Sequence, residues 1–306
     1  MGSMSAAPID RRSRGVLSPS RAADFLSCPL LYRYRTIDRL PEGSSPDAVR
    51  GTLVHQVLED IFDLPAAERT PAAAHTMLEP AWATLQSRSP SVRQVAASLD
   101  EPSWLASAHD VLDRWFVLED PTRLEPLERE AYVEVTLDNG LQLRGIIDRL
   151  DEAPDGAIRV VDYKTSNSPA EGFEAKALFQ LRVYALILWR SRGVVPRMLQ
   201  LVYLGSGASE MVRYEPDEAD LLATQHKVEA LWEAIELAQR TGEFEPNPGR
   251  QCDWCAFKAH CPVFGGSVLP MPKPPSPWAR LKRAVRRRWR RWQRRVRARR
   301  HGRHDG

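Results

Sequence analysis

Hydrophobic positions recur at helical spacing in the N-terminal part of this chain. The pattern begins behind a Ser-Pro pair at residue 18 and runs to residue 40, and it resumes from Gly51 after the breaker segment Pro41–Pro46. Residues 70–119, rich in Ala, Leu and Trp, keep the same spacing. We therefore predict N-terminal helices followed by a helical insert over about residues 62–120.

In the second half of the chain the hydrophobic period changes to two, as expected for strands with one buried face. The turn sequences Asp-Asn-Gly and Pro-Asp-Gly separate three such stretches, which predicts an antiparallel meander at residues 132–137, 141–148 and 158–163. A helix, two strands and a second long helix are predicted at residues 169–192, 198–204, 211–214 and 216–240. This mixture of sheet and helices predicts an α/β (α+β) core.

A Pro-rich stretch divides this core from a basic C-terminal segment. We expect a flexible N-terminus, one folded domain, a linker and a tail, at residues 1–17, 18–265, 266–277 and 278–306. Of the 43 Lys and Arg and the 40 acidic residues, 15 bases and one acid lie in residues 271–306, so this segment carries +14 and the rest −11. Such asymmetry is typical of a chain whose tail binds a polyanion.

Composition excludes several classes of protein. Hydrophobic residues at 43% and charged residues at 27% are close to globular averages, which excludes a disordered, fibrous or membrane-embedded chain. The apolar run Val183–Trp189 is too short to span a bilayer, and no apolar stretch follows the N-terminal arginines. We therefore expect a cytoplasmic protein without a secretory signal. The chain also has no phosphate-binding loop of a helicase.

Candidate chemistry gathers at the ends of two predicted strands. Asp162 and Lys164 are two residues apart on one strand, so both side chains leave the same face, and Asp148 lies near the end of the neighbouring strand. His55 offers an imidazole on a predicted helix. Each of these is a common polar residue by itself, but two acids and an imidazole together suit Mg²⁺ or Mn²⁺. The convergence favours a metal site.

The segments GTLVHQVLE, GIIDRLD, VDYKTS and FQLRVYALIL, in this order, resemble the RecB-family nucleases of the PD-(D/E)XK superfamily over roughly residues 18–263. The resemblance implies a restriction-endonuclease-like core with a mixed sheet flanked by helices. It also implies a Mg²⁺- or Mn²⁺-dependent deoxyribonuclease, an exonuclease of DNA repair or recombination. Implied metal ligands are His55, Asp148, Asp162 and the Tyr163 carbonyl, and implied catalytic residues are Asp148, Asp162, Lys164, Gln180 and Tyr184. Without the resemblance, Gln180 and Tyr184 would be the polar edge of a buried helix.

Four cysteines are expected to be ligands or core residues rather than disulfides in a reducing compartment. Cys252, Cys255 and Cys261 form Cys-x-x-Cys-x5-Cys, whereas Cys28 lies far upstream. Four thiolates suit either zinc or an iron–sulfur cluster, and the spacing alone does not separate the two. Iron–sulfur RecB-family members, including AddB-type nuclease subunits and CRISPR-adaptation exonucleases, have this layout. The resemblance therefore implies a 4Fe–4S cluster that joins the segment 250–263 to the N-terminal helix.

The basic tail has an apolar stripe at helical spacing, formed by Trp278, Leu281, Val285, Trp289, Trp292 and Val296. Arginines cover the remaining surface, so two partners fit: nucleic acid, through phosphates and unpaired bases, or an anionic membrane. We favour DNA, single-stranded or with free ends, and a nucleoid-associated location. Any unwinding would come from a helicase partner. Two other functions remain open: a non-catalytic DNA-binding or scaffold subunit of a helicase–nuclease complex, and a membrane-surface protein.

Overall fold

The computed structural model describes residues 15–166, 174–207 and 209–272. The predicted tail and its apolar stripe lie outside these ranges, as does the predicted start of the helix at residue 169. The chain divides into two compact units, Met1–Ser267 and Val268–Gly306, and all the helices and strands below belong to the first. In the part of the chain that is described, no helix is long and apolar enough to cross a membrane.

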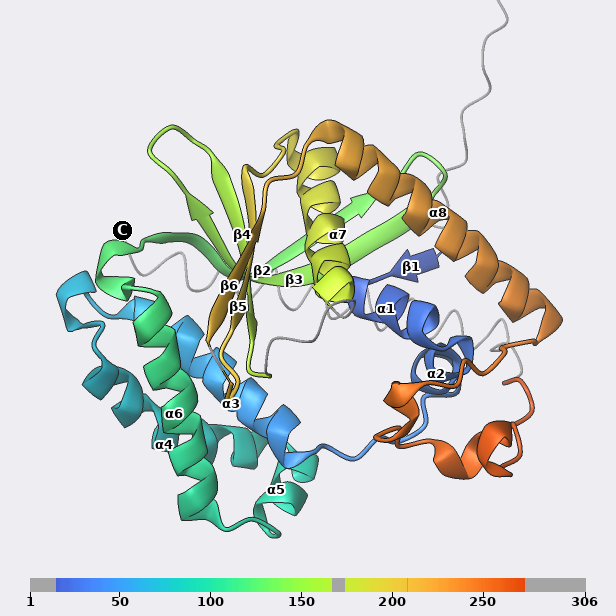
Figure 1. The fold of residues 1–306 in the computed structure, drawn as a ribbon, viewed down its shortest axis with the longest axis horizontal. Coiled ribbons are helices and arrows are strands. Elements are labelled where there is room, and N and C mark those ends of the chain that lie inside the picture. The colour runs from blue at the N-terminus through green and yellow to red at the C-terminus, as the bar shows by residue number, and fades with distance from the viewer. Residues whose placement is uncertain (1–14, 167–173, 208, 273–306) are drawn as a thin grey trace, which may run out of the picture. The chain divides into compact units, whose positions relative to one another are not determined.

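Six strands of this described part form one mixed sheet in the order β1-β3-β4-β5-β6, with β2 paired to β3 (Figure 1). Their bounds are β1 Gly15–Leu17, β2 Pro126–Thr136, β3 Leu141–Glu152, β4 Ile158–Lys164, β5 Met198–Tyr203 and β6 Glu210–Tyr214. The predicted meander is confirmed, because β2, β3 and β4 pair antiparallel. β4 and β5 run parallel, whereas β6 is antiparallel to β5. The short β1, parallel to β3, was not predicted, because three residues show no period.

Helices precede, interrupt and follow the strands. They are α1 Pro19–Ser27, α2 Pro29–Tyr32, a π-helical segment Arg33–Asp38, α3 Pro46–Asp60, α4 Pro71–Arg88, α5 Pro90–Ala96, α6 Glu101–Leu118, α7 Glu174–Arg192 and α8 Glu218–Thr241. Single 3₁₀ turns lie at Ile61–Asp63, Ala66–Glu68, Pro121–Arg123, Arg250–Cys252, Lys258–His260 and Pro262–Phe264. Helix α3 starts five residues before the predicted Gly51. Pro46 is its first residue behind the N-cap Ser45, a position that accepts proline because its N–H would be unpaired anyway.

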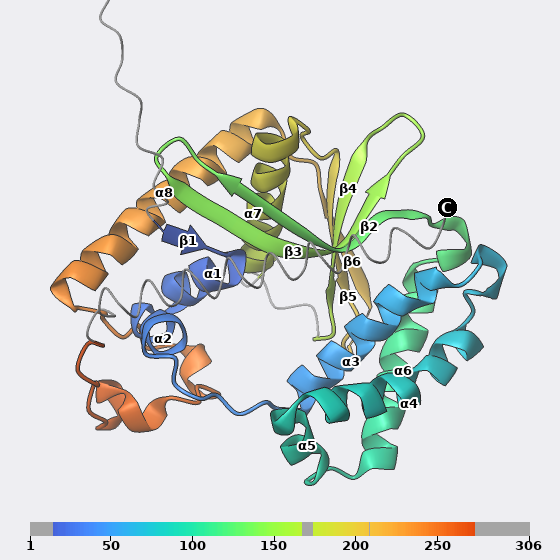
Figure 2. The ribbon, with the colours of Figure 1, turned by 180° about the vertical axis from the view of Figure 1, so that it is seen from behind.

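Helices cover both faces of the sheet. On one face, α3, α4 and α6 share a buried apolar cluster with Val161 and Tyr163 of β4 and with Val202 of β5. Helix α7 lies on the other face and packs on β2 to β5, beside α8 (Figures 1 and 2). Alternate residues of β4 therefore face two different helical layers. This separates Asp162 and Lys164, which reach α7, from Tyr163, which enters the α3 cluster.

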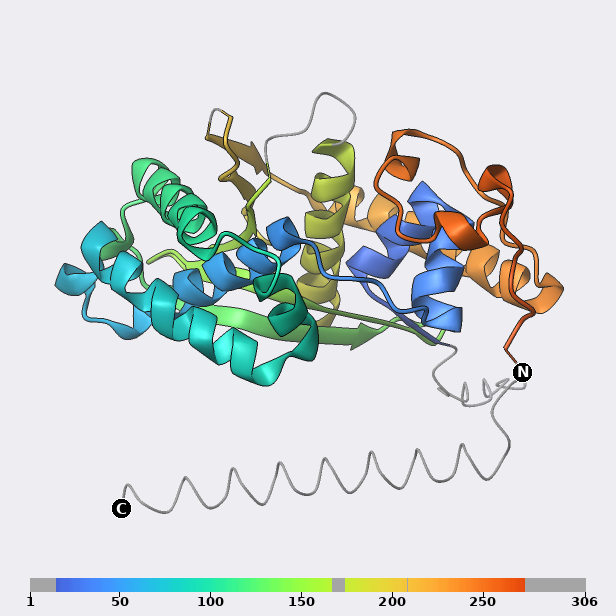
Figure 3. The ribbon, with the colours of Figure 1, turned by 90° about the horizontal axis from the view of Figure 1, so that it is seen from below.

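Segments from the two ends of the first unit lie side by side, at the opposite end from α4, α5 and α6 (Figure 3). The Tyr34 hydroxyl donates to the His260 carbonyl at 2.5 Å, and the Tyr34 ring packs on Phe257 at a centroid distance of 5.5 Å. Asn247 donates its side-chain amide to the Ser27 carbonyl at 2.9 Å. These contacts bring the region around α1 and α2 against the cysteine-containing segment.

Candidate active site

The end of β4 presents an acid and a lysine to helix α7. Asp162 Oδ2 lies 2.5 Å from Lys164 Nζ as an ion pair. Gln180 contacts both: its Nε2 donates to Asp162 Oδ1 at 3.1 Å, and its Oε1 accepts from Lys164 Nζ at 3.3 Å. The alternation of strand side chains brings the first two together, and the helix supplies the third. Gln180 therefore fixes the relative positions of the acid and the lysine.

Tyr184 lies one helical turn after Gln180 and accepts a hydrogen bond from its Nε2 at 3.1 Å. Burial, above all, raises the pKa of Tyr184, so the phenol keeps its proton at neutral pH. Its ring lies against β3 at Gly145, where an added Cβ would come within 2.4 Å of a ring carbon. Glycine at this position allows α7 to approach the strand closely.

Asp148 of β3 connects to β4 through its carboxylate. The backbone pairs of these two strands run from Glu152 opposite Ile158 to Arg149 opposite Val161. Beyond them, the Tyr163 N–H donates to Asp148 Oδ2 at 2.8 Å. Burial, followed by the nearby negative charge of Asp162, raises the pKa of Asp148 well above its ordinary range. The two acids therefore repel each other in an environment that favours a bound cation.

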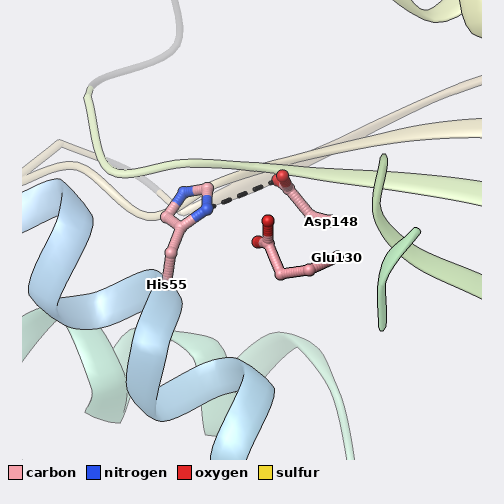
Figure 4. Close-up of side chains that lie close together, drawn as sticks. All are labelled: His55, Glu130 and Asp148. Carbon is pink, nitrogen blue, oxygen red and sulfur yellow. Dashed lines mark ion pairs between the residues drawn. The ribbon is translucent and has the colours of Figure 1, made fainter. Parts of the chain in front are cut away.

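His55 reaches this carboxylate from helix α3 (Figure 4). Its Nε2 lies 3.1 Å from the Tyr163 carbonyl oxygen, which only accepts hydrogen bonds, so a hydrogen bond between them requires the ring proton on Nε2. Burial is the main cause that lowers the pKa of His55 and favours the neutral ring. Nδ1 then carries a lone pair and faces Asp148 Oδ2 at 3.6 Å. Two acceptor atoms that face each other in this way fit a cation bound to both.

Glu130 of β2 completes this group and was missed by the sequence analysis. Among the residues that the structure describes, His55, Glu130 and Asp148 form the group whose ligand atoms lie within 4.8 Å of one another (Figure 4). Glu130 sits between the residues of β2 that pair with Arg149 and Ile147, so the register places it opposite Asp148. It has a φ of +44°, a strained value for a non-glycine residue. The sequence did contain this information. The predicted hairpin turn is centred on Asn139, and residues 130 and 148 are equally far from it, so they are expected to lie opposite each other.

The donor set fits a divalent cation. It combines carboxylate oxygens with one neutral imidazole nitrogen, the ligands that suit Mg²⁺ or Mn²⁺. Asp162 Oδ2 is buried without a hydrogen-bond partner, and its contact with Lys164 is an ion pair only. Burial, followed by the charges of Glu59 and Asp162, raises the pKa of Glu130, as expected where acids gather without a counterion.

The four cysteines gather at a second place. Cys28, Cys252, Cys255 and Cys261 all line one cavity of about 130 Å³, between the start of α2 and the C-terminal segment. All four are free thiols and partly buried, and the backbone N–H of Asn247 donates to Cys28 Sγ at 3.4 Å. The fold therefore brings Cys28 to the local triplet across more than two hundred residues of sequence.

Comparisons with known proteins agree with this architecture. The chain is 31% identical over 137 residues to the Gene 69 protein of Mycobacterium phage D29, covering 44% of this chain and 48% of that protein. It is 32% identical over 129 residues to the Gene 69 protein of Mycobacterium phage L5, covering 41% of each. The matched stretch thus spans less than half the length of either curated relative.

A crystal structure of a candidate exonuclease from Eubacterium rectale has the same fold, with a TM-score of 0.51 and 14% identity over 90% of this chain and 97% of that one. The sequence profile of the PD-(D/E)XK nuclease superfamily matches residues 16–262, which confirms the predicted fold. β3 runs four residues past Asp148, to Glu152, so this acid lies within its strand and not at the predicted end. With Asp162 and Lys164 near the end of β4, Asp148 on the adjacent β3 and a profile match over most of its length, the chain belongs to the PD-(D/E)XK nuclease superfamily.

Proposed function

We propose that this chain is a metal-dependent DNA exonuclease. The observation that carries the proposal is the convergence of three acids, an imidazole and a lysine where β3 and β4 separate. Members of the superfamily use divalent metals, and the group of His55, Glu130 and Asp148 is a possible acidic metal site. An acidic cluster beside the Lys164 ammonium and the half-buried Gln180 amide suits phosphodiester hydrolysis better than simple binding of a polyanion.

Asp148, Asp162, Glu130 and His55 would hold the ion. The Tyr163 carbonyl, expected from the sequence as a further ligand, lies against His55 Nε2 and would bind a cation only in place of that hydrogen bond. A bound Mg²⁺ or Mn²⁺ supplies a water of lowered pKa and positive charge beside the scissile phosphate. For Nδ1 of His55 to act as a ligand, Nε2 must keep the proton that it donates to the Tyr163 carbonyl. The hydrogen bond from the Tyr163 N–H fixes the Asp148 carboxylate in the same way.

Lys164 would supply the fixed positive charge of the site. Its ammonium lies beside Asp162 at the strand end, where it can orient a water and stabilise negative charge on a phosphate oxygen. Gln180 would keep this ammonium and the Asp162 carboxylate at their present separation. Tyr184 would in turn hold Gln180, because its phenol accepts the second hydrogen of the amide. Gln180 and Tyr184 are thus positioning residues in this proposal.

We further propose that Cys28, Cys252, Cys255 and Cys261 hold a 4Fe–4S cluster. Four soft thiol ligands around one cavity support a metal centre. The choice of a cluster over a single zinc ion rests on the cysteine layout, which the chain shares with the iron–sulfur nucleases that it resembles. The cluster would tie α2 to the C-terminal segment and close a loop of more than two hundred residues.

The finer features of the proposal rest on the sequence. They are action at free or single-stranded DNA ends, a helicase partner that supplies unwound strands, a role in repair or recombination, and binding of the basic tail to nucleic acid. The test is digestion of DNA labelled at the 5′ or the 3′ end, single- or double-stranded, with Mg²⁺, Mn²⁺ or EDTA. We expect metal-dependent release of mononucleotides or short products from an end. If the chain binds DNA but cleaves it with neither metal, the proposal of an enzyme fails and a non-catalytic DNA-binding subunit takes its place.

A further inference from the structure

A polar cavity of about 670 Å³ lies beyond the ends of β4 and β5. Residues that follow these two strands line it, together with residues from the start of α3 and from α6. Parallel neighbouring strands of an α/β sheet commonly bind ligands beyond their carboxyl ends. The cavity is large enough for a nucleotide-sized group, and its lining includes two guanidinium groups and several hydroxyls.

The cavity adjoins the candidate active site. Thr165 and Ser166, which line it, directly follow Lys164 on the chain. On the opposite wall, α3 contributes Arg50 to the cavity and, little more than one turn later, His55 to the metal group. The helix and the strand end are in close contact, since a Cβ on Gly51 would lie 2.9 Å from Thr165 Oγ1. The cavity therefore lies next to the strand end that carries Lys164.

Arg50 has unused capacity to bind an anion. Its Nη1 donates to Ser107 Oγ at 3.3 Å, and its Nη2 pairs with Asp47 at 2.9 Å. Its Nε is buried without a hydrogen-bond partner, and an unpaired buried donor costs free energy. A phosphate offers several acceptor oxygens and takes two parallel hydrogen bonds from a guanidinium. A phosphate bound in place of Asp47 would therefore also accept a hydrogen bond from Arg50 Nε.

The second guanidinium belongs to Arg114, whose Nε donates to the Leu204 carbonyl at 2.8 Å. This bond fixes the Arg114 side chain at the cavity wall where β5 ends. Two acids, Asp47 and Asp110, also line the cavity and balance the two arginines. The Asp47 side chain is 80% exposed, so its pair with Arg50 is weak and easily exchanged.

We propose that this cavity is a phosphate subsite that binds the DNA backbone beside the scissile phosphate, with Arg50 as its main contact and Asp47 as a competing anion. The inference rests on the proposed function, because it takes the substrate strand to run across the metal group. The subsite predicts that removing either charge of the Arg50–Asp47 ion pair changes the affinity for DNA, in opposite directions for the two residues. Loss of Arg50 weakens DNA binding, whereas loss of the Asp47 charge strengthens it.

The test measures the affinity of the full-length chain for a fluorescein-labelled single-stranded oligonucleotide in EDTA, over a series of salt concentrations. We expect Arg50→Gln to bind about tenfold more weakly, as for loss of a charged hydrogen bond. The slope of log affinity against log salt should fall by about 0.7, the contribution of one phosphate contact on single-stranded DNA. Asp47→Asn should bind more tightly than wild type. Arg50→Lys keeps the charge without the planar fork and should lie in between.

Arg93→Gln is the matched control, because Arg93 lies on α5, a helix that packs near α3, contacts the Gln86 carbonyl at 2.8 Å and does not line the cavity. Thermal melts identify any variant that fails to fold. If the Arg50 variants do not fold, Asp47→Asn, which keeps the arginine, tests the subsite instead. Equal binding by wild type and Arg50→Gln, or weaker binding by Asp47→Asn, overturns the subsite.

Cleavage by the wild type, assayed separately with Mg²⁺ and Mn²⁺, distinguishes this inference from the proposed function. If the opposite shifts in binding appear but no DNA is cleaved, the subsite stands and the nuclease proposal fails. If DNA is cleaved and the Arg50 variant binds and cleaves like wild type, the nuclease stands and the subsite fails. Absence of any DNA binding by the wild type overturns both.

Discussion

Arg149 donates a hydrogen bond to the hydroxyl of Tyr163 on the face of the sheet opposite to Asp162 and Lys164. Each of the two residues directly follows an acid of the candidate site on its strand. Arg149 also binds Glu119, just after α6, through two nitrogens at 2.8 and 2.7 Å, and it is only 1% exposed. One buried arginine therefore connects the parts of β3 and β4 that carry Asp148 and Asp162 to the helical layer on the far face.

The first prediction concerns this buried pair. Glu119→Gln should lower the free energy of unfolding by about 1–3 kcal/mol, because the buried Arg149 loses the charge of one of its two carboxylate partners and keeps only Asp151 as a counterion. Urea denaturation by circular dichroism measures the change. Glu119→Asp keeps the charge and should lose less.

The pH dependence of this effect has a definite sign. Burial raises the pKa of Glu119, but hydrogen bonds and charge from Arg149, with a hydrogen bond from Trp115, outweigh it and lower the pKa overall. A lowered pKa means that the carboxylate stabilises the fold above its ordinary value of 4.5 and loses this contribution as the pH falls below it. The difference between wild type and Glu119→Gln should therefore be full at neutral pH and shrink below about pH 4.5. A difference that grows on acidification would contradict this role of Glu119.

The second prediction is that Asp148→Asn, Asp162→Asn and Lys164→Ala each reduce DNA cleavage by about 100-fold or more, as for loss of other electrostatic stabilisers. Gln180→Ala should have a smaller effect than Asp162→Asn, since Gln180 positions the reacting groups without supplying charge. Initial rates on end-labelled DNA give the comparison, with thermal melts as the control for folding. Wild-type rates in Asp162→Asn would remove this residue from the site.

The third prediction concerns Glu130. Glu130→Gln should raise the metal concentration needed for half-maximal cleavage by about tenfold or more, because the cation loses one of its charged ligands. Glu134→Gln on the same strand is the matched control, since Glu134 accepts from the Tyr132 hydroxyl at 2.6 Å, away from the metal group. A metal titration of both variants decides the matter. If the two variants need equal metal, Glu130 is not a ligand.

The fourth prediction concerns the cysteines. Protein purified without oxygen should be brown and contain about four irons per chain, as expected for a 4Fe–4S centre with four cysteine ligands. Cys28→Ser should remove the colour as completely as Cys255→Ser, because both residues line the same cavity. Iron and zinc analysis with visible absorption makes the measurement. One zinc per chain and no iron would replace the cluster with a zinc site.

The fifth prediction concerns the basic segment at residues 271–306, which carries +14 beside an acidic remainder of −11. Its removal should weaken DNA binding and flatten the salt dependence, because each lost phosphate contact lowers the slope by about 0.7–0.9. The cleavage rate at saturating DNA should change little, since no proposed ligand lies in the segment. Co-sedimentation with anionic vesicles provides the contrast. Unchanged DNA affinity together with loss of vesicle binding would favour the membrane as its partner.

The sequence alone determined the local features of this protein. Period-two alternation placed Asp162 and Lys164 on one strand face, and two turn sequences defined the meander, because these effects act over a few residues. Capping and helical spacing likewise located most helices, although the start of α3 was misplaced where a proline was interpreted as a breaker.

Only the tertiary structure decided which distant residues meet. Glu130 joins the metal group through the register of the β2–β3 hairpin, Glu119 reaches the buried Arg149 from the end of α6, and Arg50 lines one cavity with Thr165. Periodicity in the sequence reports which face of an element is buried, but it does not report what lies against that face. That choice depends on packing between elements far apart in the chain, which is why Glu130, Glu119 and Arg50 were not found from the sequence. The distant partners that the sequence did name, such as Gln180 and Cys28, came from the family resemblance.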